Sequence, residues 1–167
     1  MKNLAIRKVL PADNLILAAL IRSVFEEHHA PQQNSVYSDP TTDDLYTLFL
    51  HPGSVLWVAL INDTIVGCCG IYPTEALEAG CAELVKFYLL PQARGKGIGK
   101  QLMLLCFQSA KEFGYKKIYL ESFPSFSAAI GMYEKLGFTR LSKPLGNSGH
   151  TACNVWMIKD IAELTSP

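Results

Sequence analysis

The chain has 167 residues, of which 49% are hydrophobic and 18% charged, and its 15 basic residues balance its 15 acidic residues. This composition is typical of one folded domain, here 1–167, and excludes a disordered chain. The balanced charge gives no indication of nucleic-acid binding. No apolar run has the length of a membrane span or of a signal-peptide core, so we expect a cytoplasmic protein that is not bound to membranes.

Hydrophobic periodicity and turn residues divide the chain into alternating strands and helices. Strands are expected at 4–9, 55–61, 64–72, 81–90, 117–120, 138–141 and 152–158. Helices are expected from 11–13 to about 28, as a short segment between 41 and 51, at 98–113, and from 124–127 to 136. This alternation predicts an α/β fold around a central mixed sheet.

Residues at the ends of these elements suggest how each begins. Asp13 is the expected N-cap of the first long helix, and Thr41 or Thr42 that of the short helix. Asn62-Asp63 separates two strand-like runs and predicts a β-hairpin.

The cysteines give no sign of a disulfide framework or a metal site. They are odd in number and lack a Cys-x-x-Cys pair, so buried reduced thiols are predicted. Cys68 and Cys69 are adjacent in a predicted strand and should point to opposite faces of the sheet. The five cysteines are Cys68, Cys69, Cys81, Cys106 and Cys153.

A glycine-rich turn, Gln92-Ala93-Arg94-Gly95-Lys96-Gly97-Ile98-Gly99-Lys100, lies between a predicted strand and a predicted helix. Alternate glycines let the backbone pass close to a ligand. The first turn of the helix offers unpaired N–H groups and the positive end of the helix dipole. With three basic residues beside it, this segment (the glycine loop) predicts a site for a pyrophosphate or a similar anion. The alternative is a simple strand-to-helix connection with solvated charges.

Two common phosphate-binding motifs are absent from the glycine loop. The dinucleotide fingerprint requires a glycine at the position of Lys100. The P-loop requires Ser or Thr after Gly-Lys, and Gln101 stands there.

A second motif follows the glycine loop: Ala129-Ile130-x-x-Tyr133-Glu134-Lys135-Leu136-Gly137-Phe138. Together with Gln92-x-x-Gly95-x-Gly97, it resembles the GNAT family of acyl-CoA-dependent N-acetyltransferases, and the order of elements fits from Leu4 to Ile158. The resemblance implies a single α/β domain. Its sheet would be mixed, mostly antiparallel and twisted, with about seven strands flanked by about four helices.

The resemblance also implies how acetyl-CoA would be held. Main-chain amides of the glycine loop would bind the pyrophosphate, and the strand before it would bind pantetheine and the acetyl carbonyl. Many relatives carry asparagine seven residues before the tyrosine; Phe126 occupies that position here, and Ser125 or Ser127 is the expected replacement. The cofactor contacts that the resemblance implies are Phe87, Tyr88, Leu89, Arg94, Gly95, Lys96, Gly97, Ile98, Gly99, Lys100 and Ser127.

Three residues match positions that carry chemistry in the family. Tyr133 would protonate the departing thiolate; alternatively it is a core residue whose hydroxyl bonds a carbonyl. Glu83 and Glu121 match positions of a catalytic glutamate and would deprotonate the amine, directly or through water. Alternatively each is a substrate-binding carboxylate or a surface ion-pair residue. No metal site is predicted.

Other candidates for the acceptor pocket are supported by fewer sequence features. His28 and His29 precede a segment that borders this pocket in relatives, and Tyr37, Asp39 and Tyr72 are further candidates. His150 and Cys153 lie near the final strands; Cys153 is expected to be buried rather than an acyl carrier.

The predicted activity is direct transfer of an acetyl group from acetyl-CoA to a primary amine of a small or amino-acid-like molecule. One alternative is a non-catalytic acyl-CoA-binding module, and a generic nucleotide-phosphate binder is another. A third is a protein N-terminal or lysine acetyltransferase. A homodimer is the general expectation for a small soluble enzyme.

Overall fold

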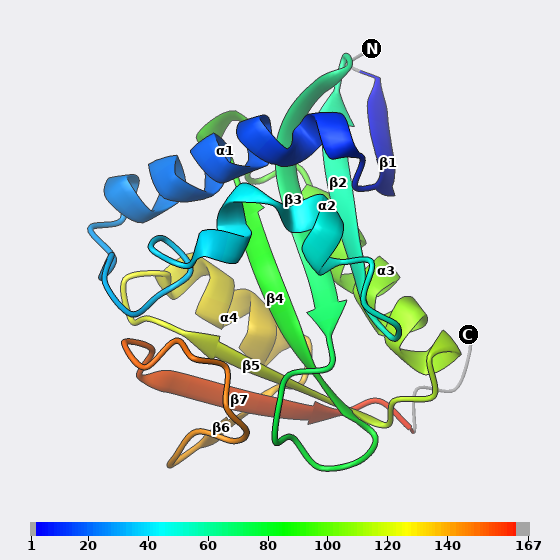
Figure 1. Ribbon diagram of the computed structural model, residues 1–167, viewed down its shortest axis with the longest axis vertical. Helices are drawn as coiled ribbons and strands as arrows, with labels where there is room; N and C mark the ends of the chain where they lie inside the picture. The colour runs from blue at the N-terminus through cyan, green and yellow to red at the C-terminus, as the bar shows by residue number, and fades with distance from the viewer. Residues whose placement is uncertain (1–2, 163–167) are drawn as a thin grey trace.

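A computed structural model describes residues 3–162 and shows a seven-stranded mixed sheet in the order β1-β2-β3-β4-β5-β7-β6 (Figure 1). Only β4 and β5 pair in parallel; the other neighbours are antiparallel. The strands are β1 Leu4–Lys8, β2 Val55–Ile61, β3 Thr64–Tyr72, β4 Cys81–Leu89, β5 Lys117–Ser122, β6 Thr139–Leu141 and β7 Val155–Asp160. The predicted fold class is confirmed.

Helices cover both faces of the sheet (Figure 1). The α-helices are α1 Asn14–Glu27, α2 Leu45–Leu48, α3 Ile98–Glu112 and α4 Ser127–Lys135. Short 3-10 helices are η1 Pro11–Asp13, η2 Pro40–Asp43 and η3 Pro91–Ala93. None of the helices among residues 3–162 has both the length and the apolar character needed to cross a membrane.

Two apolar clusters fill the space between the sheet and its helices. One is buried beneath α3 and α4, and the other beneath α1 and α2. Cys69 belongs to the first cluster and Cys68 to the second, as expected for neighbours on a strand. All five cysteines are free thiols.

The β2–β3 hairpin turns at the predicted residues. Asn62 and Asp63 have positive φ angles of 48° and 61°, which a two-residue turn needs at both positions if it is to match the twist of the flanking strands. The last strand begins later than the sequence suggested. Residues 150–153 form a turn in which the Cys153 amide donates to the His150 carbonyl at 3.3 Å, so β7 starts at Val155.

The predicted helix caps were partly wrong. Asp13 holds the N-cap position of α1, but its carboxylate accepts from Arg7 at 2.7 Å and from the Leu10 amide at 2.7 Å instead of capping. Asp39 caps η2 and Asp44 caps α2, where the sequence favoured threonine. The Asp39 carboxylate accepts from the Thr41 amide, and the Asp44 carboxylate accepts from the Thr47 amide. Each aspartate thus satisfies an amide in the first turn of its helix.

The strands β4 and β5 separate soon after they meet. They pair only at Cys81 with Lys117, Ala82 with Ile118, and Glu83 with Tyr119. On its other side, β4 carries one extra residue against β3, because the register shifts between the pairs Cys68–Tyr88 and Gly70–Val85. Such a bulge bends a strand and increases its twist. The bulge therefore directs the second half of β4 away from β5 and opens the sheet.

The glycines of β3 and α4 give a test of this packing. A Cβ added at Gly70 would lie 2.7 Å from the Val55 carbonyl oxygen and 2.9 Å from a Phe49 ring carbon, so backbone would have to move. We expect Gly70→Ala to lower the free energy of unfolding by about 1–3 kcal/mol, the usual cost of overpacking, in urea titrations.

Gly131→Ala in α4 is the matched control. Apart from its chain neighbours and the backbone of its own helix, no heavy atom of residues 3–162 lies within 4 Å of a Cβ added there. Alanine favours helix over glycine by up to about 1 kcal/mol. This variant should unfold at equal or higher urea concentration than the wild type. Equal unfolding midpoints for Gly70→Ala and Gly131→Ala would contradict the packing described for β3.

Candidate active site

A cleft of about 320 Å³ opens where β4 separates from β5, next to the start of α3. Most of the predicted site residues line it, namely Glu83, Phe87, Tyr88, Leu89, Arg94, Gly95, Gly97, Ile98, Gly99, Lys100, Glu121 and Tyr133. Lys96 and Ser127 are exposed and do not line the cleft. The fold thus brings together residues that are up to 50 positions apart in sequence, Glu83 and Tyr133.

The glycine loop forms one end of the cleft. Gly95 and Gly97 have φ angles of +70° and +75°, a region that glycine enters without strain. The Gln101 amide donates to the Gly97 carbonyl at 3.1 Å, and this is the first i to i−4 hydrogen bond of α3. The amides that precede Gln101 in the first turn have no carbonyl partner within the helix, so the N-terminal end of α3, which faces the cleft, is suited to an anion.

Gly99 fixes how closely the glycine loop approaches β4. A Cβ at this position would lie 3.0 Å from Phe87 and 3.1 Å from Leu89. Phe87 and Leu89 pack on the α3 side of the sheet, whereas Tyr88 packs on the α1 side. The absent side chain therefore lets the start of α3 lie directly against the strand that borders the cleft.

Arg94 makes protein contacts in this structure. Its guanidinium donates to both carboxylate oxygens of Glu27, at the end of α1, at 2.6 and 2.9 Å. It also donates to the Leu89 carbonyl at 3.1 and 2.8 Å. Lys96 donates to the Gln92 carbonyl. These bonds shape the glycine loop, and the predicted contacts of Arg94 and Lys96 with a cofactor stay predictions.

Tyr133 projects from α4 toward both the core and the cleft. It is only 6% exposed, and its ring centroid lies 6.0 Å from that of Phe87 and 5.8 Å from that of Phe138. Burial raises the pKa of its phenol well above the usual value near ~10. The hydroxyl is therefore protonated at neutral pH and can act as a proton donor.

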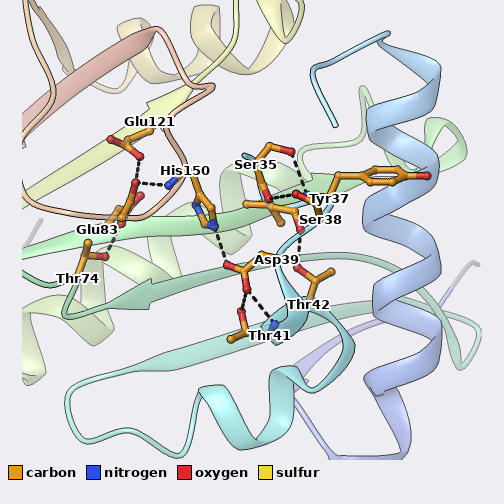
Figure 2. A network of polar contacts seen from close by, with 12 residues as sticks. Ser35, Tyr37, Ser38, Asp39, Thr41, Thr42, Thr74, Glu83, Glu121 and His150 are labelled. Carbon is orange, nitrogen blue, oxygen red and sulfur yellow. Dashed lines mark hydrogen bonds and ion pairs between the residues drawn. The ribbon is translucent and has the colours of Figure 1, made fainter. Parts of the chain in front are cut away.

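Glu83 is a buried carboxyl in the paired part of β4. It is 5% exposed, and Thr74 donates a hydrogen bond to its Oε2 (Figure 2). Burial raises the pKa of Glu83 to about 7, and the nearby charge of Glu121 acts in the same direction. The Thr74 hydrogen bond and the charge of Lys86 oppose this shift. A carboxyl with such a pKa is suited to accept a proton near neutral pH.

Glu121 takes part in a polar network that spans the cleft wall (Figure 2). Its carboxylate accepts from the Tyr119 hydroxyl at 2.7 Å and from the Ser148 hydroxyl. Ser148 Oγ in turn accepts from the His150 amide at 3.1 Å. Glu121 thus anchors the 142–154 connection to β5 while still lining the cleft.

The same network joins two residues with weak sequence signals. His150 Nε2 lies 2.7 Å from Asp39 Oδ2, although the two residues are 111 positions apart in sequence. His150 and His28 both line the cleft, and the His28 ring packs at 5.3 Å on that of Phe126. Phe126 thus presents an apolar ring at the position where the family resemblance implied asparagine.

The sequence assigned no role to Lys86, which also lines the cleft. Lys86 lies in the β4 bulge, where the strand carries its extra residue. Its φ is +56°, and it is 6% exposed. The sequence feature that could have revealed Lys86 is its charge, because it stands inside a predicted strand of large apolar residues. We call Glu83, Lys86, Glu121 and His150 the polar end of the cleft.

Cys153 also lines the cleft, where it is half-buried and not, as predicted, buried like the other four cysteines. Burial raises its pKa to about 12. Because the thiolate is the nucleophile, this thiol is inert as an acyl carrier at neutral pH. Within residues 3–162, no group of three or more His, Cys, Asp or Glu side chains could hold a metal ion.

Comparison with known proteins decides the family. A family model described as the acetyltransferase (GNAT) family matches residues 21–138. This chain belongs to the GNAT family. It is therefore an acetyltransferase, and the resemblance drawn from the two sequence motifs is confirmed.

Similar GNAT proteins are found among both sequences and structures. The chain is 36% identical over 156 residues to the uncharacterized N-acetyltransferase YjgM of Escherichia coli K12, covering 93% of each protein. A GNAT acetyltransferase from Staphylococcus aureus Mu50 superposes with a TM-score of 0.81 at 22% identity, over 95% of this chain and 99% of that one. The acetyltransferase yncA from Salmonella typhimurium, solved with acetyl-CoA, gives a TM-score of 0.75 at 18% identity, over 99% and 98% of the two chains.

The environment of Glu83 predicts a titration that NMR can measure. The carboxyl carbon of Glu83 should titrate near pH 7 in ¹³C spectra, because burial disfavours its charged form. In Thr74→Val the pKa should rise further, since the hydrogen bond from Thr74 stabilises the carboxylate. Titration of Glu83 near its ordinary value of ~4.3 would contradict this account.

Proposed function

We propose that this GNAT protein transfers an acetyl group from acetyl-CoA to the primary amine of a small molecule, directly and without an acetylated enzyme. One observation carries the proposal. A single cleft has the glycine loop at one end, the buried carboxyl of Glu83 at the other, and the protonated phenol of Tyr133 on its wall. The acetyl-CoA bound to yncA supports the choice of cofactor.

The cofactor would lie along β4. Amides from Gly95 to Lys100 would hold its pyrophosphate at the start of α3. The strand residues Phe87 to Leu89 follow the bulge, where β4 has left β5, so their main chain is available to pantetheine. The acetyl oxygen is a hydrogen-bond acceptor, so the main-chain amides of this segment, and not its carbonyls, are the groups that would hold it.

The reaction would proceed by one nucleophilic substitution. Glu83 accepts a proton from the ammonium form of the acceptor, directly or through water. The freed amine forms a bond to the thioester carbonyl carbon, and a main-chain amide near Leu89 stabilises the resulting oxyanion. As the carbon–sulfur bond breaks, Tyr133 donates its proton to the leaving sulfur. The nitrogen then gives its second proton back to the tyrosinate, so that the products are the amide, the free thiol and one proton held by Glu83.

A small acceptor is favoured by the burial of its proposed base. Glu83 is 5% exposed, so an amine must enter the cleft to reach it. The carboxyls of Glu83 and Glu121 supply negative charge there for a cationic amine. Acyl-CoA binding without catalysis would need neither Tyr133 nor Glu83 in the cleft, which favours the enzyme over a binding module.

The direct test is thiol release from acetyl-CoA with a panel of amines, amino acids and peptides. We expect turnover with small amines, and Tyr133→Phe should lower kcat by about 100-fold or more, the usual contribution of a general acid. Its affinity for acetyl-CoA, measured by calorimetry, should be nearly unchanged. Tyr46→Phe in α2, outside the cleft, is the matched control. Full turnover in Tyr133→Phe would overturn the role of Tyr133.

The pH dependence of the wild type tests Glu83. The carboxylate is the active form, so kcat/KM should fall about tenfold per pH unit below a pKa of about 7 and level off above it. In Glu83→Gln this limb should disappear and the plateau should drop by about 100-fold or more. A limb that persists near pH 7 in Glu83→Gln would assign the base to another group.

A further inference from the structure

We infer that the acceptor carries a carboxylate beside its amine, and that Lys86 binds this carboxylate. The inference rests on the proposed function and deepens it, because it names the substrate class as small amino acids or similar aminocarboxylates. It depends on Lys86 and on the partners of the carboxylates in its surroundings, Asp39 and Glu83, and of Glu121 on the same cleft.

Lys86 is held in an unusual backbone conformation at the point where β4 leaves β5. Its φ of +56° lies in the left-handed region, which a residue with a long side chain rarely enters. The bulge sets this conformation, and the side chain is 6% exposed while lining the cleft. Strain of this kind is typical of functional positions.

The carboxylates of Asp39, Glu83 and Glu121 are engaged by other donors (Figure 2). Asp39 accepts from the Thr41 amide at 2.9 Å and the Thr41 hydroxyl at 2.8 Å, and it lies 2.7 Å from the His150 ring nitrogen. Glu83 accepts from a threonine, and Glu121 accepts from a tyrosine and a serine. Across residues 3–162, no carboxylate oxygen lies within 4.0 Å of the Lys86 ammonium.

The ammonium of Lys86, whose residue is 6% exposed, therefore lacks a direct counter-charge among residues 3–162. Burial lowers the pKa of Lys86, and the more distant charges of Asp39 and Glu83 oppose this effect. A buried charge is costly unless it is paired and hydrogen-bonded. An incoming carboxylate would supply both, through a charge-assisted hydrogen bond.

The two charges of the cleft match a dipolar molecule. Glu83 and Lys86 lie three positions apart on β4, with Glu83 suited to the amine and Lys86 to the carboxylate. A polyamine would place a second cation near Lys86, where it is repelled. A peptide N-terminus has an amide in place of the carboxylate and would leave Lys86 unpaired. The arrangement thus favours free aminocarboxylates over both.

The experiment compares matched trios of acceptors at saturating acetyl-CoA. Each trio is a free amino acid, its carboxamide, and the amine that remains when the carboxylate is removed. For the wild type, kcat/KM should be roughly 10- to 100-fold higher for the free acid, the range expected for a hydrogen bond to a charged group. In Lys86→Met this preference should disappear. Lys116→Met, at an exposed lysine outside the cleft, should keep it.

Circular dichroism and acetyl-CoA affinity check that Lys86→Met is folded. If it is not folded, the comparison of kcat/KM within each trio for the wild type tests the inference. Equal kcat/KM for acids, amides and amines in the wild type would overturn the inference while leaving the proposed function intact. A preference for acids that survives in Lys86→Met would do the same. Absence of thiol release with every amine and peptide, despite acetyl-CoA binding, would overturn the proposed function as well.

Discussion

The separation of β4 from β5 is the constraint on which the rest of the site depends. Three residue pairs hold the strands together, and the bulge at Lys86 then turns β4 away. An intact sheet would satisfy these backbone groups internally and leave no room for a ligand. Because the strands part, the glycine loop, Tyr133 and the polar end all face one cleft.

Burial governs the proton affinity of Glu83 in this cleft, while hydrogen bonds from neighbours hold the other carboxylates in place. Thr74 bonds Glu83 without neutralising it, so burial still determines its proton affinity. Asp39 and Glu121 are tied by hydrogen bonds to segments that close the cleft wall. Lys86 is the exception, since the protein supplies it with charge nearby but with no ion-pair partner among the described residues. Glu83 and Lys86 are thus the two groups left for chemistry and recognition.

Much of the fold was predictable because its signals are local. Alternating apolar residues and the Asn62-Asp63 turn located the β2–β3 hairpin, and the glycine loop located the start of α3. Long-range relations were not predictable. No local pattern reveals that His150 meets Asp39, that a bulge places Lys86 in the cleft, or that Glu27 binds Arg94. Ser127, chosen from its position in the motif, is exposed and outside the cleft because α4 presents Ala128 and Ala129 there instead.

The contacts of Arg94 bear on the thermodynamics of cofactor binding. Its guanidinium bridges the end of α1 and the Leu89 carbonyl, so the glycine loop is tied at two points before any ligand arrives. A loop that is ordered in advance loses little conformational entropy on binding, and more of the interaction energy is expressed as affinity. The ion pair between Arg94 and Glu27 therefore orders the glycine loop for binding of the pyrophosphate, even if neither side chain contacts that anion.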